Sequence, residues 1–171
     1  MFEIEAKIRL SDDDLKRLRK ELPKIAKRSH KSIKQDSYYG DLKTFYLRIR
    51  KKNKFGILNL KSKRVEKGIE VNQEIELPLI SASKFHNFLK TINVPLTAKK
   101  EKKSEVYKKG NIQIELNLVK KLGYFLEIEI IANTRKDIPN AKKALLRAFS
   151  QLGFTPDKFE KKYYLEMLMS K

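Results

Sequence analysis

Residues 2–10, FEIEAKIRL, alternate apolar and charged side chains without a break. Successive side chains on a strand point to opposite faces of a sheet. One face of this strand therefore carries Glu3, Glu5 and Lys7, and the other is apolar. The two carboxylates lie about 6–7 Å apart, given a rise of about 3.3 Å per residue, and repel each other unless a positive charge is near. The segment predicts either a solvated strand face or a cation-binding face.

The same alternation recurs in five further segments, which predicts a mainly antiparallel sheet. Each segment separates apolar side chains from polar or charged ones, and any one of them alone also fits a solvated sheet face. Charge on the polar face of all six strands together favours a closed barrel with a charged interior. The five segments are 44–50, 57–63, 69–77, 112–118 and 124–131.

Helical segments separate these strands. Ser11, followed by three aspartates, predicts the start of one helix, and Ser81 predicts the start of a second. Residues 139–152 form a third predicted helix, and Thr155, followed by proline, starts a fourth. Strands mixed with scattered helices predict an α+β fold in a single domain, residues 1–171.

The composition indicates an anionic partner. Lysine and arginine number 40 against 21 aspartates and glutamates, a net charge of +19. Such an excess predicts nucleic acid, an acidic membrane surface or a phosphate-rich small molecule as the partner. The chain has no cysteine, which excludes disulfides and thiolate metal sites.

The N-terminal residues and the apolar runs of the sequence bear on the cellular compartment. Charged and apolar residues alternate from the second position of the chain, unlike in a signal peptide. No apolar run approaches the roughly 18–20 residues of a membrane span. We therefore expect a cytoplasmic protein that does not enter the membrane. A composition rich in lysine and glutamate and free of cysteine is also typical of a thermophile.

EIEAK, residues 3–7, resembles the ExExK signature of the CYTH superfamily, also called triphosphate tunnel metalloenzymes. Further segments resemble the family's motifs in the family's order, over nearly the whole chain. The resemblance is closest to the branch of class IV adenylyl cyclases and thiamine triphosphatases. The segments are QDSYYGD at 35–41, LRIR at 47–50, LNLK at 58–61, NQEIE at 72–76, KKLGYFLEIE at 120–129 and YLEML at 164–168.

This resemblance implies a closed eight-stranded antiparallel β-barrel, open as a tunnel, with helices packed outside. It implies Mg²⁺ or Mn²⁺ as cofactor, and paired carboxylate oxygens suit such hard cations. It also implies that Lys7 orders a nucleophilic water. The implied metal ligands are Glu3, Glu5, Glu127 and Glu129, with Glu74 and Glu76 completing the metal shell or orienting the cations. The implied phosphate-binding residues are Lys7, Arg48, Arg50, Lys61, Lys63 and Lys102.

Three positions depart from the family's pattern. Asn72 and Ser104 stand where the family usually has arginine, and Asn117 stands where it usually has aspartate. The first two changes remove phosphate-binding cations. The third weakens an implied metal ligand, because a neutral amide oxygen binds a divalent ion less tightly than a carboxylate.

Several functions stay open from the sequence alone. The first is turnover of a triphosphate-containing small molecule, either hydrolysis of tripolyphosphate, nucleoside triphosphate or thiamine triphosphate, or cyclisation of ATP to cyclic AMP and pyrophosphate. The second is a catalytically degenerate protein that binds polyphosphate or nucleotide. The third is nonspecific nucleic-acid binding by the basic runs 16–20, 50–54 and 99–103, of which the last two are predicted as loops or strand ends. The chain would be a monomer or a homodimer.

Overall fold

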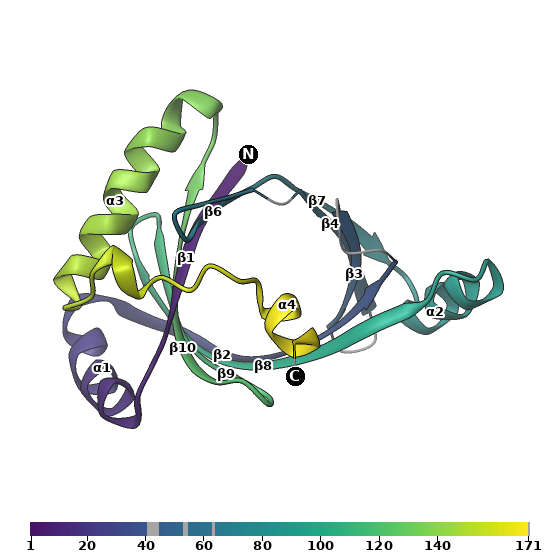
Figure 1. The fold of residues 1–171 in the computed structure, drawn as a ribbon, viewed down its shortest axis with the longest axis horizontal. Coiled ribbons are helices and arrows are strands. Elements are labelled where there is room, and N and C mark those ends of the chain that lie inside the picture. The colour runs from purple at the N-terminus through teal and green to yellow at the C-terminus, as the bar shows by residue number, and fades with distance from the viewer. Residues whose placement is uncertain (41–44, 53–54, 63, 171) are drawn as a thin grey trace.

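One curled antiparallel sheet dominates the fold (Figure 1). The computed structural model describes residues 1–40, 45–52, 55–62 and 64–170. The strands are β1 (Phe2–Arg9), β2 (Lys27–Tyr39), β3 (Phe45–Lys52), β4 (Phe55–Ser62), β5 (Val65–Glu66), β6 (Ile69–Asn72), β7 (Glu74–Leu79), β8 (Leu96–Lys109), β9 (Ile112–Val119) and β10 (Gly123–Ala132). The helices are α1 (Asp12–Ile25), α2 (Ala82–Thr91), α3 (Ile138–Gln151) and α4 (Tyr164–Met169).

The strand order corrects the expected barrel. The described strands form one ten-stranded sheet in the order β5-β6-β1-β10-β9-β8-β2-β3-β4-β7, with every pairing antiparallel. Within the described ranges no ladder joins the end strands β5 and β7, so the closed eight-stranded barrel is not confirmed. The two ends of the sheet are nevertheless linked by the chain, because β6 leads into β7 through Gln73 alone.

The observed strands differ from the predicted ones in three places. The segment 69–77, predicted as one strand, is divided at Gln73 into β6 and β7, which pair with β1 and β4 respectively. The long strands β2 and β8 were not predicted, and the run 99–103, predicted as a loop or strand end, lies within β8. Both faces of β2 and β8 carry polar side chains, so apolar alternation is a poor signal for them.

The hydrophobic core lies on the outer face of the sheet. Ile4, Ala6 and Ile8 of β1 are buried together with the apolar side chains of β9 and β10. Helices α1 and α3 cover this face with leucine, alanine and phenylalanine side chains spaced by three or four residues. The opposite face of β1, which carries Glu3, Glu5 and Lys7, therefore turns inward.

The predicted helix starts are confirmed in three of four cases. The side chain of Ser11 accepts a hydrogen bond from the Asp14 amide at 3.1 Å, and Ser81 caps α2 in the same way. Helix α3 begins at Ile138, one residue before the predicted start. The helix predicted from Thr155 is wrong, because the chain there makes only a 3₁₀ turn. It then runs extended, with the Glu160 amide donating to the Lys7 carbonyl at 2.8 Å.

Helix α4 lies on the inner side of the curled sheet, near β8, which corrects the expectation that the helices pack outside (Figure 1). Its Tyr164 ring packs edge-on against Phe125 of β10, with ring centroids 5.0 Å apart. Phe125 and Tyr164 form a small apolar cluster with Val119, Leu122 and Met167. Among the described helices, α4 included, none is long and apolar enough to cross a membrane.

The turn between β5 and β6 generates a stability prediction. Gly68 has φ +81°, and a Cβ at this position would lie 2.7 Å from the Cβ of Phe159. We expect Gly68→Ala to lower the free energy of unfolding by about 1–3 kcal/mol more than Gly110→Ala, because overpacking adds to backbone strain. Gly110 is the matched control, since its φ is +58° but a Cβ there would contact nothing within 4 Å. Urea denaturation of both variants measures the difference, and equal losses would contradict the prediction.

Candidate functional site

The inner face of the sheet encloses a cavity of about 420 Å³ that is lined mainly by charged side chains. In the described lining, glutamates outnumber lysines and arginines by eight to six. These side chains come from strands far apart in the sequence, and the charged members are Glu3, Glu5, Lys7, Lys34, Arg48, Arg50, Glu70, Glu74, Glu76, Lys100, Lys102, Glu115, Glu127 and Glu129.

Strand register brings three carboxylates into one row. Glu5 of β1 lies opposite Glu129 of β10 on one side and opposite Glu70 of β6 on the other. Directly opposed residues on neighbouring strands have Cβ atoms about 4.5–5.5 Å apart, and like charges in such positions are destabilising. Glu70 was not among the predicted site residues, since its place in this row depends on the division of segment 69–77.

The pKa of Glu129 shows the effect of this crowding. Burial, followed by repulsion from Glu5 and Glu127, raises the pKa of Glu129 to about 7. The amide of Gln113 donates to Glu129 Oε2 at 3.3 Å, which satisfies one oxygen without neutralising the charge. Buried carboxylates therefore crowd one another on this wall of the cavity.

A hard divalent cation would suit this wall. Carboxylate oxygens are the donors that Mg²⁺ and Mn²⁺ prefer, and a cation would relieve the repulsion between Glu5 and Glu129. Within the described residues, no group of three or more His, Cys, Asp or Glu side chains is gathered in a geometry that could hold a metal ion. The donors thus fit a cation in kind and in charge, without forming a ready coordination shell.

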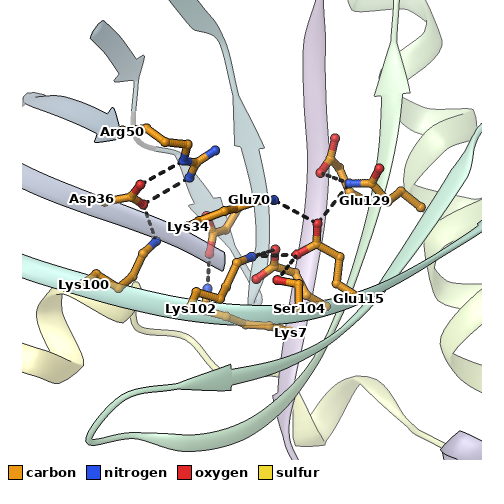
Figure 2. Close-up of polar contacts among 12 residues, drawn as sticks. Lys7, Lys34, Asp36, Arg50, Glu70, Lys100, Lys102, Ser104, Glu115 and Glu129 are labelled. Carbon is orange, nitrogen blue, oxygen red and sulfur yellow. Dashed lines mark hydrogen bonds and ion pairs between the residues drawn. The ribbon is translucent and has the colours of Figure 1, made fainter. Parts of the chain in front are cut away.

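Lys102 and its partners occupy the centre of the cavity (Figure 2). The Lys102 ammonium lies 2.7 Å from Glu115 Oε2 and 2.9 Å from Glu127 Oε1, and Lys34 approaches Glu115 Oε1 to 3.1 Å. Burial lowers the pKa of Lys102, but Glu115 and Glu127 outweigh it and hold this pKa above its ordinary value. Lys102 is therefore a fully charged residue that neutralises carboxylates from two strands.

Lys7 is equally buried and equally charged. Its ammonium forms an ion pair with Glu70 and lies 5.2 Å from the centre of the Tyr164 ring. Burial opposes the charge, yet Glu70 and Glu5 raise the pKa of Lys7 above its usual value. Near neutral pH the side chain therefore acts as a positive charge and hydrogen-bond donor, not as a proton acceptor.

The opposite wall is basic and surrounds one carboxylate, Asp36 of β2. Arg50 donates to both Asp36 oxygens, at 2.8 and 3.1 Å, and the Lys100 ammonium lies 3.1 Å from Oδ2 (Figure 2). Arg48 lies 3.9 Å from the same oxygen and 3.7 Å from Glu74. Burial would raise the pKa of Asp36, but Lys100 and Arg50 hold it well below its ordinary value. Asp36 is thus ionised and holds the cations together.

The predicted site residues meet around this cavity, except where the structure does not describe them. The backbone of Lys61 lies on β4 opposite Glu74, but its side chain and the whole of Lys63 lie outside the described residues. Glu74 and Glu76 accept hydrogen bonds from Asn59 at 2.8 and 3.3 Å, beside the basic wall. The predicted members in the described lining are Glu3, Glu5, Lys7, Arg48, Arg50, Glu74, Glu76, Lys102, Glu127 and Glu129.

Sequence reasoning missed five charged residues of the site. Three of them, Lys34, Asp36 and Lys100, belong to charged i, i+2 pairs along a strand, which a search for such pairs in basic segments would have found. Lys34 and Asp36 share one face of β2, and Lys100 shares a face of β8 with Lys102. Glu115 lies two residues before Asn117 on β9. The missed residues are Lys34, Asp36, Glu70, Lys100 and Glu115.

The three positions that depart from the family's pattern are all buried near the cavity. Asn72 donates to Glu70 at 3.3 Å, and Ser104 donates to Glu115 at 3.4 Å. Asn117 is opposite Ser104 in the β8–β9 ladder. Where the family has cations, two neutral donors thus bind carboxylates without adding positive charge.

Glu129 provides a pH prediction. Glu5→Gln removes the negative charge opposite Glu129, so we expect its pKa to fall from about 7 toward 4.5. Because the folded protein holds a proton that the unfolded chain releases, the contribution of Glu129 to the free energy of unfolding falls as pH rises from about 4.5 to 7. An NMR titration of the Glu129 carboxyl in metal-free protein measures the pKa. Glu66→Gln on β5, a distant exposed carboxylate, is the control, and an unchanged pKa in Glu5→Gln contradicts the prediction.

Known proteins share the sequence pattern and the fold of this chain. A protein of Methanocaldococcus jannaschii named "Putative adenylate cyclase MJ0240" is 24% identical over 174 residues, covering 98% of each chain. The solved structure of the PH1012 protein from Pyrococcus horikoshii superposes with a TM-score of 0.83 at 27% identity, covering 96% of this chain and 98% of that one. The RNA triphosphatase domain of a mimivirus mRNA capping enzyme shares the fold, with a TM-score of 0.57 at 13% identity over 90% of each chain.

The family match covers nearly the whole chain. The profile of the CYTH domain matches residues 1–164, which includes every described strand and ends at the first residue of α4. Together with the inward-facing EIEAK segment on β1, this match shows that the chain belongs to the CYTH domain family.

Proposed function

We propose that this protein binds a triphosphate-containing small molecule together with Mg²⁺ or Mn²⁺ in the cavity of the curled sheet and hydrolyses it. The observation that carries the proposal is the separation of charge across one cavity of about 420 Å³. A basic wall around Asp36 faces a carboxylate-rich wall around Glu5 and Glu129. The cavity volume lies within the range of small-molecule sites.

The basic wall would bind the phosphates. Arg48 and Arg50 each present a planar fork that matches phosphate oxygens bidentately, whereas lysine supplies a point charge. Lys102 would join them, as would Lys61 and Lys63 on the evidence of their positions in the sequence. Phosphoryl transfer depends mainly on positioning and charge neutralisation, which such a wall provides.

The carboxylate wall would hold the cation. Glu3, Glu5, Glu127 and Glu129 would be its ligands, and Glu74 and Glu76 would complete or orient the shell. The cation, when bound, would neutralise phosphate charge. Lys7 would then orient the attacking water through its N–H donors, since its ammonium is charged and lies beside Glu70.

Cyclisation of ATP is the second candidate, and the name of the Methanocaldococcus jannaschii relative favours it. That reaction needs an adenine pocket and a 3′-hydroxyl in line with the α-phosphate, whereas hydrolysis needs only a positioned water. The neutral residues Asn72 and Ser104, where the family has arginine, leave fewer cations to fix a nucleotide. Hydrolysis is therefore the leading proposal, and a binding protein without turnover is the third candidate.

Nonspecific nucleic-acid binding has weaker support. In the run 99–103, Lys100 and Lys102 point into the cavity and form ion pairs with Asp36 and Glu115, so the run is not a continuous surface cluster. In the run 16–20, Arg17 and Arg19 pair with Glu21 and Glu105. A DNA affinity that collapses between low and physiological salt would identify a purely electrostatic interaction.

Product analysis tests the proposal. We expect orthophosphate release from tripolyphosphate, ATP or thiamine triphosphate with Mg²⁺ or Mn²⁺, and a loss of about a hundredfold or more in Glu5→Gln, because several kcal/mol of cation-mediated stabilisation disappear. Glu66→Gln is the matched control, since Glu66 pairs with Lys142 at the surface, outside the cavity.

The products separate the candidates. Formation of cyclic AMP with equimolar pyrophosphate would show that the reaction is cyclisation and not hydrolysis. Metal-dependent binding of the triphosphate without any product would indicate the binding protein. Equal activity in Glu5→Gln and in the wild type would contradict the assignment of Glu5 to the cation.

A further inference from the structure

Lys100 is a cavity-lining cation for which the CYTH resemblance gave no role. It lies on β8 directly opposite Asp36 of β2, and its side chain is only 6% exposed. Its ammonium lies 3.1 Å from Asp36 Oδ2 and 5.3 Å from the centre of the Tyr164 ring (Figure 2). The side chain is therefore held from two directions, by a carboxylate and by an aromatic face.

Asp36 is shared by several cationic side chains. Arg50 and Lys100 bind it within 3.1 Å, and Arg48 lies 3.9 Å away. Arg48 also lies 3.7 Å from Glu74, so Asp36 is the shared partner of Arg50 and Lys100 above all. An ammonium also has three N–H donors, and the bond to Asp36 uses one of them.

We propose that Lys100 is a phosphate-binding residue and that Asp36 is the positioning residue that keeps its ammonium charged and aimed into the cavity. This inference rests on the proposed function. It adds Lys100 as a further residue that contacts phosphate, and Asp36 as the carboxylate that keeps Lys100 charged and in place. Asp36 would act through Lys100 and the arginines, without being a metal ligand.

The need for Asp36 follows from what surrounds Lys100. Burial disfavours the ammonium, Asp36 favours it, and Arg48, Lys102 and Arg50 repel it, with the result that the pKa of Lys100 is lowered to about 8. Without Asp36 the opposing contributions would lower this pKa further. The charged or titratable groups facing Lys100 are Asp36 and Tyr38 on β2, Arg48 and Arg50 on β3, Lys102 on β8 and Tyr164 on α4.

Because the pKa of Lys100 is about 8, phosphate binding by its ammonium depends on pH. Below pH 8 Lys100 is an ammonium and attracts phosphate oxygens; above pH 8 it loses its proton and contributes only neutral donors. The free energy of a hydrogen bond to a charged group is large enough that losing the bond weakens affinity by about tenfold to a hundredfold. Arginine in the same position would keep its charge throughout this range.

Calorimetric titration with inorganic tripolyphosphate tests the proposal. Binding is measured from pH 6.5 to 9.5 in EDTA, so that no cation-dependent turnover consumes the ligand. For the wild type we expect affinity to fall by at least tenfold above pH 8. Lys100→Arg should remove most of this fall, and Asp36→Asn should move it to lower pH, because the remaining cations then destabilise the ammonium.

The variants distinguish positioning from a merely structural role. Glu101→Gln is the matched control, since Glu101 neighbours Lys100 on β8 but bonds to Gln35 outside the cavity; its pH profile should match the wild type. If affinity depends on pH in the same way in the wild type and in Lys100→Arg, the proposal is overturned, even if Asp36→Asn does not fold. Absence of tripolyphosphate binding in EDTA at every pH would also overturn it, whereas the proposed function would fail only if binding and turnover were absent with Mg²⁺ and Mn²⁺.

Discussion

Charge pairing inside the curled sheet is the constraint on which the rest of the structure depends. Removing an ion from water costs several kcal/mol unless an opposite charge and hydrogen bonds compensate it. Lys102 meets this condition by binding Glu115 and Glu127, so that a single ammonium ties β8 to β9 and β10. Lys7 does the same for β1 and β6 through Glu70. Strand order and side-chain chemistry are therefore coupled, because each buried charge needs a partner from another strand.

The apolar part of the protein supports this arrangement from outside. The outer face of β1, β9 and β10 packs under α1 and α3, which leaves the inner face free for charged side chains. Helix α4 is the exception, since Tyr164 and Phe125 bring an apolar and aromatic surface to the inner side. There the Tyr164 ring faces the ammonium groups of Lys7 and Lys100, and the attraction of a cation to an aromatic face is stronger when it is desolvated.

The distribution of charge relates this architecture to the proposed function. Glu5 lies between Glu70 and Glu129 in one row of carboxylates, and burial together with repulsion from Glu5 and Glu127 raises the pKa of Glu129. On the basic wall one carboxylate, Asp36, faces three cations. The first wall gathers carboxylates, and the second gathers cations around Asp36. A phosphate chain with a divalent cation would complement both walls at once.

The sequence by itself determined the inner and outer faces of the regular strands, because the period of two places Glu3, Glu5 and Lys7 together whatever the topology. It also predicted the capped helices and, through the ordered motifs, the CYTH family. Only the tertiary structure decided which charges meet. Asp36 with Lys100, and Glu5 with Glu70, are far apart in the chain, and their contacts depend on strand order and register. The strands β2 and β8 were not predicted because both of their faces carry polar side chains, which apolar alternation does not detect.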